Sequence, residues 1–167
     1  MTKTTFVTMR GFVEYAKVFT ENMDDNMEFH EKIQGQFNVN FYPKDEVEFA
    51  KYFDAGAPQE SMGHSAIKNG NSELATGKFL KLKRPNVHPS GIEDFGSAPK
   101  VFDFRDGEST KQWEYDVDGE VGNGSEVLAK VSIYGDGPRA SIRLEKVAVL
   151  SLEVYIPGNT EGGEDKF

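Results

Sequence analysis

Two runs of sequence near the end of the chain decide the fold: SEVLAKVSIYG (125–135) and SIRLEKVAVLSLEVYI (141–156), separated by a turn at Asp136-Gly137. In both runs apolar side chains, mostly Val, alternate with polar ones, which is the pattern of β-strands with one buried face. The Asp-Gly pair favours a tight connection between strands. The two runs therefore predict an antiparallel pair.

The same alternation predicts further strands upstream. TFVTMRGFVEYAKVF (5–19) is expected to form a long strand with a bulge or sharp bend at Gly11. Its expected core-facing set is Val7, Met9, Gly11 and Val13. A second strand is expected over QFNVNFY (36–42), where Phe37, Val39 and Phe41 share one face, and shorter ones over GKFLKLKR (77–84) and KVFDFR (100–105). About five strands with one helix fit a small barrel.

The remaining segments are helix, loop and tail. Pro43 precedes KDEVEFAKYFD (44–54), which predicts a short amphipathic helix. The side chains expected to be buried by this helix are Val47, Phe49, Ala50 and Phe53. Residues 20–35 and 54–75 lack periodicity and are expected to be loops, the second one long and potentially functional. The end of the chain, GNTEGGEDKF (158–167), has no core pattern and is expected to be disordered.

Length and composition restrict the class of protein. The 167 residues suit one domain, and the absence of Cys excludes disulfides and thiolate zinc sites and suits a reducing cytoplasm. Lys and Arg total 19 against 28 Asp and Glu, so the formal net charge is -9. No apolar run reaches the length of a membrane span, and MTKTTFVTMRGF lacks the apolar core of a signal peptide. A soluble, intracellular protein with no membrane partner is expected.

One segment departs from this acidic character. Residues 76–105 carry six basic and three acidic side chains. By contrast, residues 1–60 and 106–167 have a net negative charge, and residues 61–75 are neutral. Within GKFLKLKR, alternation places Leu80 and Leu82 toward the core. The opposite, solvent-facing set is Phe79, Lys81 and Lys83. An exposed ring stacks on unpaired bases and ammonium groups neutralise phosphates, so this strand predicts a single-stranded nucleic-acid contact. The alternative is an ordinary solvated strand face with one stray aromatic.

Other residues are weaker candidates for that contact surface. Trp113, in the polar segment KQWEYD, is expected either to stack on a base or to close one end of the barrel. The further DNA-binding candidates are Arg10, Phe12, Tyr15, Lys17, Lys78, Arg84, Lys100 and Arg105. For each of them a solvated or structural role is the simpler alternative.

Catalysis finds little support in the sequence. The three histidines, at positions 30, 64 and 88, lie in different loops, with no metal partner at helical or hairpin spacing. The acidic residues Asp116, Asp118 and Glu120 lack EF-hand spacing and are interpreted as a solvated turn. No helix is expected after the Gly-rich stretch GEVGNGS to present amides to a phosphate. The sequence therefore predicts no enzyme, no metal and no cofactor.

Three pieces of the chain together resemble one family. GNGSEVLAKVSIY, which begins at Gly122, followed by ASIRLEKVAVLSL (140–152), resembles the C-terminal hairpin of phage single-stranded DNA-binding proteins of the podophage replication type and their tailed-phage relatives. The opening GFVEYAKVF (11–19), with its Tyr-Ala pair, is similar to the family's first strand. The end EGGEDKF resembles the family's acidic tail with a terminal Phe, although it is shorter and less acidic.

The resemblance implies an all-β fold with a short helix. It implies a five-stranded Greek-key OB barrel over residues 1–157 and an acidic tail over 158–167. The implied function is sequence-independent single-stranded DNA binding in phage replication, recombination and repair, in the host-cell cytoplasm. The tail would contact DNA polymerase and helicase-primase, and a homodimer is implied as well. The tail residues concerned are Glu161, Glu164, Asp165 and Phe167.

Two other classes of function remain open from the sequence. A small β-sandwich virion or interaction protein would share the same Gly, Val and aromatic content. A nucleotide hydrolase that uses carboxylates on a small barrel is a third hypothesis. A groove lined by Phe79, Lys81 and Lys83 would distinguish the first hypothesis from both.

Overall fold

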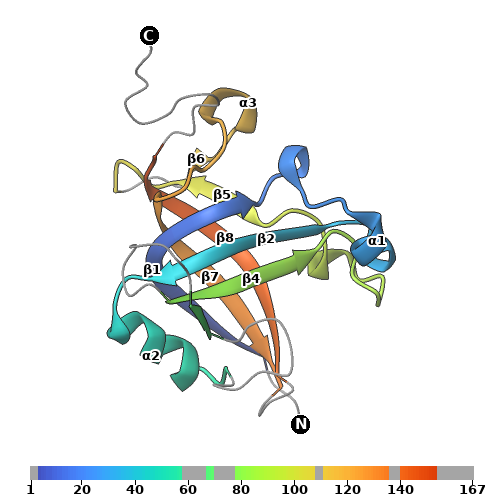
Figure 1. Cartoon of the computed structure of the whole chain (residues 1–167), viewed down its shortest axis with the longest axis horizontal. Helices are drawn as coiled ribbons and strands as arrows, with labels where there is room; N and C mark the ends of the chain where they lie inside the picture. The colour runs from blue at the N-terminus through green and yellow to red at the C-terminus, as the bar shows by residue number, and fades with distance from the viewer. Residues whose placement is uncertain (1–3, 58–66, 70–77, 108–110, 136–139, 154–167) are drawn as a thin grey trace.

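The computed structural model describes residues 4–57, 67–69, 78–107, 111–135 and 140–153. Eight strands form one sheet (Figure 1). Their bounds are β1 (Thr4–Lys17), β2 (Gln36–Pro43), β3 (Ile67–Asn69), β4 (Lys78–Pro85), β5 (Lys100–Asp103), β6 (Lys111–Gln112), β7 (Glu126–Tyr134) and β8 (Ser141–Ser151). The helices are α1 (Met27–His30), α2 (Glu46–Asp54) and α3 (Tyr115–Asp118), with 3-10 turns at Thr20–Asn22, Glu31–Ile33 and Glu93–Phe95.

The long strand β1 joins two parts of the sheet, because its two halves pair with different strands. Its first half pairs antiparallel with β7, from Thr4 opposite Tyr134 to Phe12 opposite Glu126. Its second half pairs antiparallel with β2, from Gly11 opposite Pro43 onward. The two halves overlap at Gly11 and Phe12, so the chain must coil there from one side of the barrel to the other.

Gly11 lies where β1 and β2 come closest. A Cβ at this position would overlap the carbonyl oxygen of Tyr42 and lie 2.9 Å from the ring of Phe41. The expected irregularity of β1 is therefore a close backbone approach at Gly11. The break in register comes later, between Glu14 and Lys17. Tyr15, within that break, has a φ of 52°.

The strand order identifies the architecture. The sheet runs β3-β4-β2-β1-β7-β8-β5-β6, and its five long strands follow the Greek-key order β4-β2-β1-β7-β8. The sheet does not close through backbone ladders. Instead, the side chain of Arg84 on β4 bonds to the carbonyl oxygen of Leu144 on β8. A partly open five-stranded Greek-key barrel with an extra helix is an OB fold, as the family resemblance implied.

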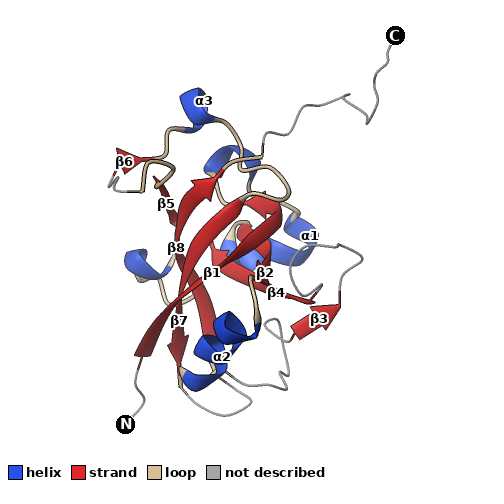
Figure 2. Ribbon diagram, turned by 90° about the vertical axis from the view of Figure 1, so that its left-hand side faces the viewer, coloured by secondary structure: helices blue, strands red, loops and turns tan. Residues whose placement is uncertain are grey.

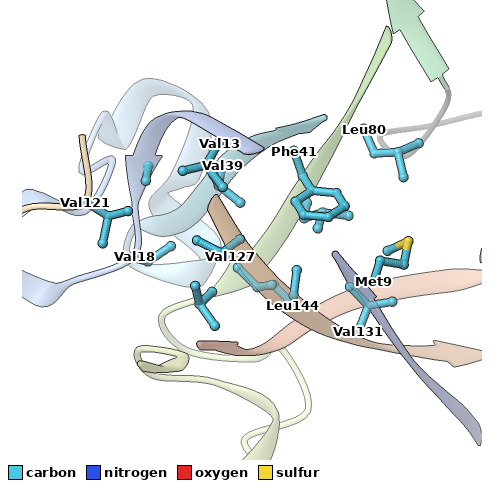
Figure 3. Packing of buried hydrophobic residues seen from close by; sticks show 14 of the residues in the cluster. Met9, Val13, Val18, Val39, Phe41, Leu80, Val121, Val127, Val131 and Leu144 are labelled. Carbon is cyan, nitrogen blue, oxygen red and sulfur yellow. The ribbon is translucent and has the colours of Figure 1, made fainter. Parts of the chain in front are cut away.

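The barrel interior is the hydrophobic core (Figure 3). Alternate residues of the long strands fill most of it, and Val18 and Val121, which lie outside the strands, complete it. The labelled strand residues are Met9, Val13, Val39, Phe41, Leu80, Val127, Val131 and Leu144. The core-facing sets expected on β1, β2 and β4 are confirmed, with Val7 only half-buried. Strand alternation was sufficient here because the inward side chains of each strand are mostly apolar, even on β2, where the outward Asn38 and Tyr42 are buried too.

Helices cover opposite ends of the barrel (Figures 1 and 2). At one end α2 packs against β1 and β2 and buries Phe49 and Tyr52. The predicted burial of Val47 and Ala50 is wrong: both are exposed, because the apolar stripe of α2 runs through Phe49, Tyr52 and Phe53 instead. At the other end lies α3, beside the buried Trp113.

Several elements were not expected from the sequence. Within the segment 54–75, predicted as loop, the short strand β3 pairs with β4, and most of the other residues lie outside the described part. The strand β5 pairs in parallel with β8, and β6 pairs with β5. Among the described residues, no helix combines the length and the apolar character needed to cross a membrane.

Candidate nucleic-acid interface

The outward side chains of β1, β2 and β4 form three rows across these strands, a surface that we call the β1–β2–β4 face. In antiparallel ladders, residues directly opposite one another project to the same side of the sheet. The rows are Phe12–Tyr42–Phe79, Glu14–Asn40–Lys81 and Lys17–Asn38–Lys83. One aromatic row therefore lies beside two rows that contain lysines, as Phe79, Lys81 and Lys83 were expected to do.

The aromatic row is held in a defined geometry. The ring of Phe79 packs on that of Tyr42, with centroids 5.3 Å apart and planes tilted by 41°. Tyr42 is only 2% exposed, and its hydroxyl donates a hydrogen bond to Glu14 Oε1 at 2.8 Å. Burial and the hydrogen bond to Glu14 hold the Tyr42 ring in place, and this ring supports Phe79. Phe79 itself is half-buried, so part of its side chain is exposed to solvent.

The lysine rows make this face locally cationic. Three lysines on it stand against a single carboxylate, that of Glu14, which already accepts the bond from Tyr42. Within the described residues, Lys17 and Lys81 have no ion-pair partner. Asn38 is buried between Lys17 and Lys83, and its amide donates to Gln36. The ammonium groups of Lys17 and Lys81 are thus presented to an anion from β1 and β4, the two strands that flank β2 in the sheet.

A pocket of about 300 Å³ lies at one end of the face. Its lining includes Tyr15, Lys17, Asn22 and Asn123. Tyr15 has a left-handed φ of 52°, which is strained for a residue with a bulky side chain, and its N–H donates to Asn123 Oδ1 at 2.7 Å. This backbone projects the Tyr15 side chain, which is 64% exposed, next to Lys17. Tyr15 and Lys17 thus lie together, as candidates, at the end of the face.

Arg84 does not belong to this face. Its side chain is buried and points inward, with Nε donating to the Ser97 carbonyl and Nη2 to the Gly96 carbonyl, both at 2.8 Å. Nη1 pairs with Glu145 at 3.1 Å. The alternation that places Leu80 and Leu82 in the core places Arg84 there too, so the sequence contained the signal. The structure therefore corrects the assignment of Arg84 from DNA contact to barrel closure.

Arg105 and Trp113 are likewise structural. Trp113 is 5% exposed, and its Nε1 donates to the Gly119 carbonyl, so it closes the barrel end and is withdrawn as a base-stacking residue. The Arg105 guanidinium lies 4.8 Å from the Trp113 ring centroid and bonds to Asp103 and Asp118. The hydrogen bonds from Arg105 lower the pKa of Asp103 to about 2. The charge of Arg105 is thus balanced locally.

Of the remaining candidates, some lie on or beside the β1–β2–β4 face and others lie away from it. Phe12 is part of the aromatic row, and Lys78 is exposed at the start of β4. Arg10 pairs with Glu126 on the β7 side of β1, which raises the pKa of this guanidinium further, and Lys100 lies on β5. The candidates from the sequence did not include the outward set of β2, which is Asn38, Asn40 and Tyr42, although it is the complement of the core set in QFNVNFY.

Two solved structures have a fold similar to that of this chain. The single-stranded DNA-binding protein from bacteriophage Enc34 matches over 95% of this chain and 88% of its own, with a TM-score of 0.53 and 12% sequence identity. The C-terminal truncation of that protein matches over 90% of this chain and 88% of its own, with a TM-score of 0.56 and 12% identity. This chain has the fold of a phage single-stranded DNA-binding protein.

Sequence comparison adds nothing to this: no protein-family model and no curated protein sequence matches the chain. The candidate site lies where OB folds in general bind their ligands. OB folds bind oligonucleotides or oligosaccharides on the face of their second and third barrel strands. In this chain those strands are β2 and β4. In the part of the chain that the structure describes, no group of three His, Asp or Glu side chains is placed to hold a metal ion.

Proposed function

We propose that the chain binds single-stranded DNA without sequence preference, through the β1–β2–β4 face, and has no catalytic role. The observation that carries the proposal is the Phe12–Tyr42–Phe79 row beside Lys81 and Lys83, on the barrel strands where OB folds bind oligonucleotides. Stacking on a ring accepts any base, because every base has a π-face. Lysine contacts to phosphates carry no sequence information.

A single strand suits this face better than a duplex does. A base must be unstacked from its neighbours before it can pack on Phe79, and in a duplex its two faces are covered. The positive charge of this face comes from three lysines, on a chain of net charge -9. Such a protein is not a general polyanion binder, so stacking must contribute to affinity alongside phosphate contacts.

The wider role that we propose is in phage DNA replication, recombination and repair, in the cytoplasm of the host cell. It is supported by the family resemblance of the hairpin and first strand and by the names of the proteins that share the fold. The tail with Glu161, Glu164, Asp165 and Phe167 lies outside the described residues. Our proposal assigns it contacts with DNA polymerase and helicase-primase, and includes a homodimer. The β-sandwich alternative loses its basis because the barrel is an OB fold.

The test compares fluorescently labelled oligo-dT with a duplex of equal length by anisotropy. Wild type should bind the single strand more tightly, and K81Q/K83Q should bind it less tightly. The control K44Q/K51Q removes the same charge near and on α2, outside the face. Equal affinity for duplex and single strand, or an equal loss in both double variants, would contradict the proposal.

A further inference from the structure

A second cationic surface lies on the other side of β1. On β7, β8 and β5, which are neighbours in the sheet (Figure 2), Lys130 is directly opposite Lys146, and Lys146 is directly opposite Lys100. The next outward row along these strands is Leu128, Ala148 and Phe102. Three lysines therefore stand side by side on adjacent strands, next to an apolar row. We call this surface the β5–β7–β8 face.

This lysine row is costly for the folded protein. Like charges that face each other across strands destabilise a sheet. The chain has 28 acidic residues from which partners could be drawn, yet none of the three lysines forms an ion pair within the described residues. Instead, Lys130 Nζ lies 5.2 Å from the ring centroid of Phe6, and Lys146 Nζ 6.0 Å from that of Phe102. In the part of the chain that the structure describes, no carboxylate compensates this row, and its ammonium groups are placed to meet an anion.

An apolar pocket adjoins the lysines. It has a volume of about 290 Å³ and is lined by Phe102, Phe104, Leu128 and Ala148 together with Lys130 and Lys146. Phe6, at 57% exposure, adds a ring beyond Lys130. On this face too, aromatic rings therefore lie beside ammonium groups, as they do on the β1–β2–β4 face.

The two faces form one continuous outer surface. Phe12 belongs to both ladders of β1: it is opposite Tyr42 on one side and opposite Glu126 on the other. The carboxylate of Glu126 at this junction is neutralised by its ion pair with Arg10. A strand that leaves the aromatic row at Phe12 can therefore continue toward Leu128 without meeting an unpaired carboxylate of Glu126.

We propose that the β5–β7–β8 face is a second track for the same single-stranded DNA, with phosphates on Lys100, Lys130 and Lys146 and a base in the adjoining pocket. The inference rests on the proposed function and extends it. A polymer with one phosphate and one ring per unit matches a surface in which cations and rings repeat. An acidic peptide with an aromatic residue, such as the C-terminal segment 154–167, is the competing occupant.

The test uses K130Q/K146Q and oligo-dT of two lengths, about 6 and about 16 nucleotides, which lie near the low end and at the high end of the range for one OB fold. The short strand should bind as tightly as it does to wild type. The long strand should bind more weakly, and its log–log salt slope should shrink by about 1.4, since each lost phosphate contact removes about 0.7. In the K44Q/K51Q control, the affinity for the short and the long strand should change by the same factor. Thermal melting checks that each variant is folded.

Other outcomes separate the two proposals. If wild type binds neither length, the proposed function itself fails. If wild type binds both lengths and K130Q/K146Q leaves the long-strand slope unchanged, the second track is overturned while the function stands. It is also overturned if a labelled peptide of residues 154–167 loses binding in K130Q/K146Q while DNA affinity is unchanged, because the face would then be a peptide site.

Discussion

Phe79 and Leu82 lie on the same strand but on opposite faces, so their substitutions should separate binding from folding. Phe79→Ala removes one stacking platform and should weaken oligo-dT binding by about 1–3 kcal/mol. Its effect on stability should be smaller, because Phe79 is only half-buried. Leu82 is fully buried, and Leu82→Ala should destabilise the fold by about 2–5 kcal/mol through the cavity that it leaves.

Anisotropy with oligo-dT and urea unfolding measure the two effects. Molecules of Leu82→Ala that remain folded should bind with nearly the affinity of wild type. If Phe79→Ala unfolds the protein while Leu82→Ala only weakens binding, the assignment of the two faces of β4 is wrong.

At this scale, strand alternation predicted most of the candidate site. It placed Phe79, Lys81 and Lys83 outward correctly, because a strand with one buried face leaves no other choice. Alternation also places Arg84 inward, as the structure confirms, whereas its positive charge alone suggests a DNA contact and is misleading. Trp113 carried no periodic signal, and only the packed structure shows that it is buried.

At the scale of elements, Arg84 links β4 to β8 where backbone pairing does not close the barrel. Arg84→Met should destabilise the protein by about 3 kcal/mol, the lower end for loss of one partner of a buried ion pair, because Glu145 keeps its bonds to Arg143 and Ser132. Binding of folded molecules to oligo-dT should change little. Urea unfolding and anisotropy test this, and a selective loss of DNA affinity at unchanged stability would return Arg84 to the interface.

A second link, at the end of β5, should depend on pH. Arg105 lowers the pKa of Asp103 to about 2, below its ordinary value of about 3.9. The stabilisation is therefore fully present above about pH 4 and is lost as the pH falls through 2. The stability difference between wild type and Asp103→Asn, measured by thermal melting from pH 6 to pH 2, should shrink across this window. A difference that stays constant would contradict the pair's role.

The strand pairings that the sequence did not predict share one cause: each joins segments whose pairing depends on the folded chain and not on a local sequence pattern. Nothing local to KVFDFR or to the end of β8 shows that β5 runs parallel to β8, since that pairing depends on how the chain returns after β4. The strand β3 was likewise hidden in a Gly- and Ser-rich segment, because only its alignment with β4 makes it a strand. By contrast, the pairing of β7 with β8 is local, and it was predicted from the sequence, although β8 ends at Ser151, before the predicted end at 156. The predicted turn at Asp136-Gly137 lies outside the described residues.

At the scale of the whole molecule, the chain has a net charge of -9, yet lysines gather on the β1–β2–β4 face. The lysine rows of the β1–β2–β4 face are the natural target of an anionic segment of the same chain. Deleting residues 158–167, with the tail's Glu161, Glu164 and Asp165, should tighten binding to oligo-dT at low salt because a competing anion is removed. The melting temperature should stay almost unchanged. A fall in DNA affinity on deletion would make the tail part of the binding site instead.

The most direct test of the central claim is the salt dependence of oligo-dT binding in wild type and in K81Q/K83Q. A label on the DNA is required, because Trp113 is buried at the barrel end and is a poor reporter of this face. Binding through phosphates predicts that log affinity falls linearly with log salt. The slope of K81Q/K83Q should be shallower by about 1.4, for two phosphate contacts at about 0.7 each. A slope near zero in wild type, or an identical slope in K81Q/K83Q, would contradict the assignment of the β1–β2–β4 face as a single-stranded DNA interface.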